Sequence, residues 1–119
     1  MTVISHQTHA LSINPASGEQ IGHYPYESAA VQDATLARSS AGYAVWRRTP
    51  VEARVERLLA LAAALRDNVE AMARMITDEM GKPIAQARGE IEKCAQLCEW
   101  YAGAGPAMVA PEVAPVPVG

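Results

Sequence analysis

The stretch Thr49–Pro83, TPVEARVERLLALAAALRDNVEAMARMITDEMGKP, decides the fold of this chain. Apolar residues recur in it in steps of mostly three and four, which is the period of a helix with one buried face. At its start, Thr49 is a natural N-cap, Pro50 fits the first helical position, and Glu52 completes a capping box. The stretch therefore predicts an amphipathic helix with a well-defined beginning.

The apolar positions form one stripe about eight turns long, which predicts a single helix over about residues 50–80. An interruption near Asp67-Asn68 is the alternative. Gly81 and Pro83 end the helix, because Gly suits a left-handed cap and Pro cannot continue the hydrogen-bond ladder. The stripe consists of Val51, Val55, Leu58, Leu59, Ala62, Leu65, Val69, Met72, Ile76 and Met80.

The segments around this stretch predict a mainly α fold, with an N-terminal β-hairpin and three to four amphipathic helices. Residues 11–24 alternate on both sides of a Pro/Gly/Asn cluster, which indicates a hairpin. Helical periods cover about residues 28–46, where Ser28 is the cap, and about residues 83–102. Residues 1–10 read as a flexible arm. Residues 106–119 contain four prolines and read as a Pro-rich, non-helical tail.

The composition sets the size of the core. The chain has 119 residues, of which 50% are hydrophobic, 23 are Ala and none is Phe. A chain of this length forms one small domain at most. Ala favours helices but buries little area, so the core is expected to be thin. A complete enzyme that also holds a large cofactor is therefore improbable.

Charge and hydropathy exclude several classes of partner. The net charge is −3 and no basic stripe occurs, so we expect no nucleic-acid partner. The longest apolar run, Leu58–Leu65, has eight residues, whereas a membrane span needs about 20. Residues 1–7 have neither a basic nor an apolar region of a secretory signal. We therefore expect no membrane partner and a cytoplasmic location.

The sulfhydryl groups are Cys94 and Cys98, four residues apart on one face of a predicted helix. Their Cβ vectors would run parallel, which does not suit a disulfide. A metal site would need further ligands, and the His residues lie far upstream. We interpret both cysteines as reduced, packed core residues. Catalytic or redox use is the alternative.

The polar face of the long predicted helix carries Arg66, Glu70, Arg74, Asp78 and Lys82 at i,i+4 spacing. Alternating charges at this spacing form pairs along one helix, so the face is interpreted as a solvated ladder.

The remaining polar and aromatic candidates also favour structural roles. The sequence contains no G-x-G-x-x-G, Walker, G-x-S-x-G, H-E-x-x-H or C-x-x-C motif. We therefore assign no catalytic, cofactor-binding or metal-binding residue. The carboxylate pairs are interpreted as solvated ion-pair partners, His23 as a surface or packing residue, and the large aromatics as core anchors rather than a ligand-stacking platform. These carboxylates and aromatics are Glu52/Glu56, Glu90/Glu92, Trp46, Trp100 and Tyr101.

The order of the segments resembles that of NAD(P)-dependent aldehyde dehydrogenases. Ser12–Gly22 resembles the family's opening hairpin, and Ala41–Pro50 resembles its aromatic-Trp helix end with the following cap. Ile76–Ala87 contains the sequence E-M-G-K-P and resembles the family's E-x-G-K-P helix junction. Cys94–Ala102, followed by Gly105–Met108, is similar to the bacterial succinate-semialdehyde dehydrogenase branch.

The resemblance runs from about Leu11 to Glu112 without a large gap. It implies that residues 11–105 are the incomplete N-terminal part of the NAD(P)-binding domain in the α/β aldehyde-dehydrogenase fold, with a truncated tail after them. The family's oxyanion-binding Asn, cofactor-binding Lys and glycine loop, general-base Glu and nucleophilic Cys all lie downstream of this segment. That Cys stands in a G-Q-x-C context, which neither Cys94 nor Cys98 has.

The resemblance therefore implies an N-terminal fragment of an enzyme that uses NAD or NADP to oxidise an aldehyde, best guessed as succinate semialdehyde, to the carboxylate. We expect the chain alone to be inactive and to bind no cofactor. Its expected partners are the remainder of the enzyme or other subunits of a homo-oligomer. The alternative is a stand-alone helical interaction module that associates with a partner or a full-length subunit.

Overall fold

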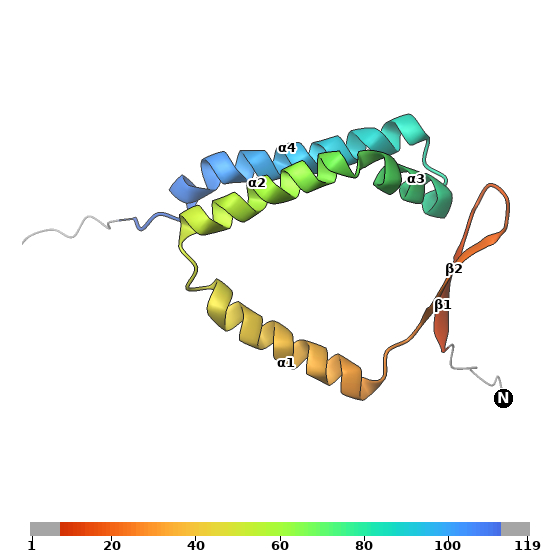
Figure 1. Ribbon diagram of the computed structural model, residues 1–119, viewed down its shortest axis with the longest axis horizontal. Coiled ribbons are helices and arrows are strands. Elements are labelled where there is room, and N and C mark those ends of the chain that lie inside the picture. Colours follow the sequence, from red (N-terminus) through yellow and green to blue (C-terminus); the bar gives the residue numbers. More distant parts are fainter. Residues whose placement is uncertain (1–7, 113–119) are drawn as a thin grey trace, which may run out of the picture.

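The computed structural model describes residues 8–112. Figure 1 shows a hairpin followed by four helices, with α2 and α4 side by side and α1 set apart from them. The fold class predicted above is confirmed. The elements are β1 (His9–Ile13), β2 (Gln20–Pro25), α1 (Ala29–Trp46), α2 (Val51–Asp67), α3 (Val69–Met80) and α4 (Ile84–Met108).

The hairpin pairs β1 and β2 antiparallel, with a register shift between Ser12 and Ile13. Its loop is closed by Asn14, whose side-chain oxygen accepts hydrogen bonds from two backbone N–H groups of the turn. Gly18 adopts φ +76°, as the loop requires. The predicted C-terminal boundary of the arm, at residue 10, is wrong because His9 and Ala10 belong to β1. Residues 1–7 of the predicted arm lie outside the described residues.

Helix α1 begins where the sequence predicts. The Ser28 hydroxyl accepts a hydrogen bond from the backbone N–H of Val31, which satisfies one of the free donors of the first turn. All of α1 is exposed, and it contributes no buried residue. Within the described chain, α1 thus has an apolar face with little packed against it.

The long predicted helix is divided in two, so the alternative of an interruption holds. Asn68 has φ −110° and ψ 12°, and its side-chain amide donates to the Ala64 carbonyl at 2.8 Å. Such a side-chain bond competes with regular helix geometry, and Figure 1 shows α3 running in a different direction from α2. The predicted capping box is wrong, because the Thr49 hydroxyl donates back to the Val45 carbonyl and α2 has no side-chain cap.

Helix α4 follows the tight junction at Gly81, which takes φ +70° as predicted for a left-handed cap. The helix continues to Met108 with Pro106 inside it, so the predictions of an end near residue 102 and of no helix after residue 105 are wrong. Proline has no N–H, and it removes the bond to the carbonyl four residues earlier. Pro106 lies in the last turn, two residues before the helix ends; residues 113–119 of the predicted tail lie outside the described residues.

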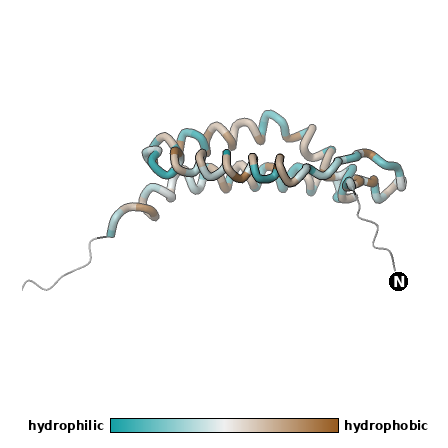
Figure 2. Tube along the Cα trace, turned by 90° about the horizontal axis from the view of Figure 1, so that it is seen from below, coloured by the Kyte–Doolittle hydropathy of each residue, from teal (hydrophilic) through white to brown (hydrophobic). Residues whose placement is uncertain are grey.

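The core lies where α2 and α3 pack against α4, and it consists mostly of alanine. Figure 2 shows hydrophobic and hydrophilic positions alternating along the helices, as expected for amphipathic segments. Small side chains let the helix backbones approach closely, while most of the large apolar side chains of the predicted stripes stay partly exposed. The buried residues are Ala62, Ala73, Ala87, Ile91, Ala95 and Ala102.

The molecule is open. Its radius of gyration is 21.3 Å, whereas a compact domain of this length has about 13–14 Å. Its accessible surface is 9768 Å², whereas a compact protein of this mass exposes about 6,200 Å². The excess surface includes exposed large apolar side chains on every element. The described residues therefore leave much of their apolar surface unpacked.

Candidate functional site

The cysteines are free, as predicted, but they are not both packed in the core. Cys94 is exposed and Cys98 is partly buried, so the interpretation of core residues is wrong for Cys94. Both lie on α4, and the buried positions beside them are taken by Ile91 and Ala95. The sequence period predicts both cysteines on the apolar face of the helix, yet little of the described chain covers Cys94.

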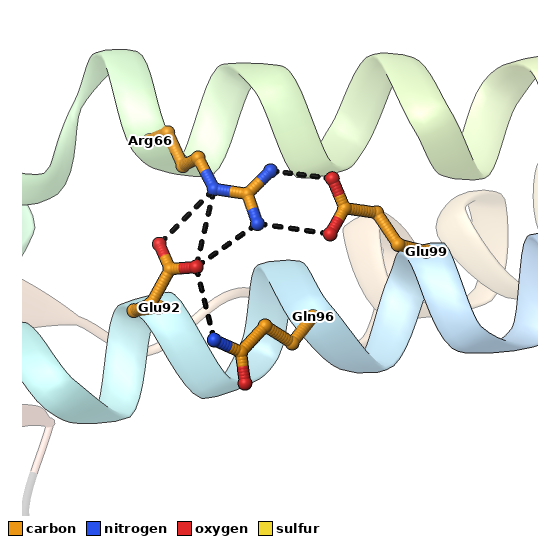
Figure 3. A network of polar contacts seen from close by, with 4 residues as sticks. All are labelled: Arg66, Glu92, Gln96 and Glu99. Carbon is orange, nitrogen blue, oxygen red and sulfur yellow. Dashed lines mark hydrogen bonds and ion pairs between the residues drawn. The ribbon is translucent and has the colours of Figure 1, made fainter.

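An ion-pair network centred on Arg66 joins α2 to α4 (Figure 3). The Arg66 guanidinium donates to Glu92 through Nε at 3.0 Å and Nη2 at 2.9 Å. It also donates to Glu99 through Nη2 at 2.9 Å and Nη1 at 2.5 Å. Gln96 donates to Glu92 at 3.2 Å. One guanidinium therefore bridges two carboxylates that lie about two turns apart on α4.

This network shifts the pKa of its members. Hydrogen bonds from Arg66 hold the pKa of both Glu92 and Glu99 below the ordinary value, and the two carboxylates raise the pKa of Arg66. Charge-assisted bonds of this bidentate kind fix geometry as well as adding energy. The network thus sets the register of α2 against α4 rather than serving acid–base chemistry.

One further ion pair joins two helices, and another joins a loop to a helix. Glu70 of α3 accepts from Arg88 of α4 at 2.7 Å, and Lys82, in the loop before α4, pairs with Glu90. The face interpreted as solvated does expose Glu70 and Arg74. Pairing along one helix is not what the structure shows for Arg66 and Glu70, whose partners lie on α4. The interpretation of Glu90 and Glu92 as ion-pair partners is confirmed.

The hairpin lies against the end of α3. The Ser12 hydroxyl donates to Glu79 at 3.1 Å, and Pro15 lies close to Gly81. His23 is exposed, as predicted, and its ring lies 4.4 Å from the ring of His9 on the paired strand. The loop of the hairpin is thereby tied to the α3–α4 junction.

The large aromatics are not core anchors within residues 8–112. Trp46 is 47% exposed, and Trp100 is 53% exposed with its ring 4.9 Å from that of Tyr101. Trp46 and Tyr101 instead line a shallow cavity of about 230 Å³ between the end of α1, the start of α2 and the end of α4.

Arg54 also lines this cavity, and the sequence analysis gave it no role. Its Nε atom is buried and has no hydrogen-bond partner in the part of the chain that the structure describes. The signal that could have found it is its spacing. Arg54 follows Val51 by three residues and precedes Leu58 by four, so a charged residue sits within the apolar stripe.

Among the described residues, neither a metal-binding cluster nor a membrane-spanning helix is present. Within residues 8–112, no three His, Cys, Asp or Glu side chains gather into a group that could hold a metal ion. None of the helices formed by these residues is long and apolar enough to span a membrane. The expectation that the chain carries no catalytic or cofactor-binding residue stays a prediction.

Comparison with known proteins gives one consistent relationship. A family model described as "Aldehyde dehydrogenase family" matches residues 3–118. The NAD(P)+ succinate semialdehyde dehydrogenase Sad of Escherichia coli K12 is 50% identical over 109 residues, which cover 92% of this chain and 24% of that protein. An NADP+ succinate-semialdehyde dehydrogenase of Deinococcus radiodurans is 31% identical over 91% of this chain and 23% of its own length.

Solved structures agree with this relationship. An aldehyde dehydrogenase from Brucella melitensis superposes with a TM-score of 0.84 at 30% identity, covering 93% of this chain and 23% of that one. A succinate-semialdehyde dehydrogenase from Burkholderia pseudomallei gives 0.81 at 32% identity, covering 92% and 23%. The chain therefore spans about a quarter of the length of these relatives. It belongs to the aldehyde dehydrogenase family and corresponds to the N-terminal segment of that fold.

Proposed function

We propose that this chain builds the outer helical layer and opening hairpin of the cofactor-binding domain in an NAD(P)-dependent enzyme that oxidises succinate semialdehyde to the carboxylate. The observation that carries the proposal is the 50% identity to the E. coli succinate semialdehyde dehydrogenase over 92% of the chain. The substrate and the choice of NAD or NADP both rest on this similarity.

The role proposed for the chain itself is support. In the family, a Cys thiolate attacks the aldehyde, a hydride passes to the nicotinamide, and a Glu-activated water releases the acid. We assign none of these groups to this chain, so it is inactive alone. Its own residues join α4 to α2 and to α3 through the ion pairs of Arg66 and Arg88.

The proposed partner is the remainder of the enzyme. Large apolar side chains of α1, α2 and α4 are exposed, and extended apolar surface of this kind is typical of a contact with another part of a protein. Relatives are about four times as long as the matched segment, so the remainder is large enough to cover these faces. Exposed apolar faces also suit the alternative of a stand-alone interaction module.

Sequencing the gene beyond the codon of Gly119 separates the two functions. A continuing reading frame with a G-Q-x-C motif supports the enzyme. A frame that stops at once supports the interaction module. Expression of the continuing frame, followed by NADH and NADPH formation with succinate semialdehyde and with longer and uncharged aldehydes, then tests the substrate. A preference for an uncharged aldehyde would refute the substrate assignment.

A chimera tests the structural role directly. In it, this chain replaces the matching N-terminal segment of the E. coli enzyme. We expect the chimera to reduce NAD(P)+ with succinate semialdehyde, and we expect neither the 119-residue chain nor the remainder of the E. coli enzyme to do so alone. Turnover by the 119-residue chain that Cys94→Ala or Cys98→Ala abolishes would refute the supporting role.

A further inference from the structure

The cavity beside Trp46 contains one charge without a counter-charge. Its walls come from the end of α1, the start of α2 that follows it, and the distant end of α4, and apart from Arg54 they are apolar or uncharged. No ion pair among residues 8–112 includes Arg54. The apolar part of the lining includes Val55, Leu58, Pro106 and Val109.

The buried Nε of Arg54 costs free energy as long as no acceptor pairs with it. A buried donor without an acceptor keeps the full penalty of losing its water, and a guanidinium is charged at every physiological pH. A carboxylate is a well-matched partner for Arg at such a site, because the guanidinium donors fit both carboxylate oxygens. The cavity thus has the chemistry of a site for an acidic side chain with an apolar neighbour.

We propose that this cavity receives an Asp or Glu side chain, flanked by an apolar residue, from the remaining part of the enzyme, and that this carboxylate pairs with Arg54. The proposal rests on the proposed function, because about three quarters of the length of the relatives lies outside the matched segment. The pair would fasten the end of α1 and the end of α4 to the body of the enzyme.

The chimera described above provides the test. The unsubstituted chimera is measured first, so that a failure to fold or to turn over contradicts the proposed function and not the pairing of Arg54. Arg54→Met keeps the length of the side chain but removes its charge. Arg57→Met is the matched control, because Arg57 is exposed one turn away on α2.

We expect Arg54→Met to leave a carboxylate buried without a partner, which lowers the thermal unfolding midpoint of the chimera by more than about 2 °C. Arg57→Met should leave the midpoint unchanged, and Arg54→Lys should restore part of the loss. In the 119-residue chain, where the guanidinium lacks its acceptor, Arg54→Met should be neutral or stabilising.

Arg54→Met is thus expected to lower the midpoint of the chimera but not that of the 119-residue chain. If Arg54 only packed against its neighbours in this chain, both midpoints would change in the same direction. An unchanged or raised midpoint of the chimera with Arg54→Met overturns the proposal. Substituting the acidic residues of the remainder one at a time by their amides then identifies the partner. The partner's substitution should lower the midpoint by a similar amount, and combining it with Arg54→Met should add little. Full additivity for every acidic residue would also overturn the proposal.

Discussion

Ile91 is the one large side chain among the buried residues of the described chain, and its truncation tests whether the α2–α4 contact holds the fold. Ile91 is 6% exposed, and its neighbours in the core are alanines. Ile91→Ala removes three carbons, which at about 0.8 kcal/mol each account for about 2 kcal/mol of lost burial. The cavity adds about 1 kcal/mol, so we expect a total loss of about 3 kcal/mol.

Leu97→Ala is the matched control, because it removes as many carbons from the same helix and introduces the same residue. Leu97 is 55% exposed, so its truncation forfeits about half of the burial and opens no cavity; we expect a loss of about 1 kcal/mol or less. Urea unfolding of the 119-residue chain, followed by far-ultraviolet circular dichroism, measures both. Equal losses for the two variants, or a larger one for Leu97→Ala, would refute the assignment of the core.

Three further outcomes are expected. Arg66→Met should remove an acid-sensitive part of the stability. The pKa of Glu92 and of Glu99 is lowered in the fold, so their contribution is present above the unfolded pKa and is lost as pH falls through the folded one. Urea midpoints across acidic pH should therefore fall less steeply for the variant than for the parent; the variant keeps the pair of Arg88 with Glu70, whose pKa is also lowered. Gly81→Ala should destabilise the fold by about 1 kcal/mol or more, because Gly81 has a positive φ and an added Cβ would meet Pro15. Gly89 lies in open space within α4, so Gly89→Ala should stabilise the fold by about 0.5–1 kcal/mol in the same assay. Cys94 should react with a thiol reagent faster than Cys98, as mass spectrometry of partly labelled chain would show; equal rates would count against their different exposure.

Local signals in the sequence predicted the elements well where the residue acts on its own backbone. Ser28 caps α1, and Gly81 ends α3 in the left-handed conformation, as expected. The Thr49 cap was wrong: its hydroxyl donates to the Val45 carbonyl, and no backbone N–H of α2 donates to a side-chain cap. The rule that proline stops a helix was wrong at Pro106, which lies within the last turn of α4.

Partners that lie far apart in the sequence could not be predicted in this way. The period of α2 places Arg66 on a polar face, but it does not say that Glu92 and Glu99 lie opposite. The period of α4 likewise places Cys94 on the apolar stripe, yet its burial depends on what covers the stripe. The buried Nε of Arg54 was not foreseen either, because the period of α2 does not show which distant residues surround it.

The open shape of the described chain matters while the protein is being synthesised. During synthesis the N-terminal quarter of such an enzyme leaves the ribosome first. Relatives of this length add roughly 340 residues after the matched segment, which takes on the order of 20–70 s at about 5–20 residues per second. Large apolar side chains such as Leu36, Val45 and Met75 are exposed in the described chain. If the segment is extended as in these relatives, they stay exposed throughout that interval and offer an apolar surface to a chaperone.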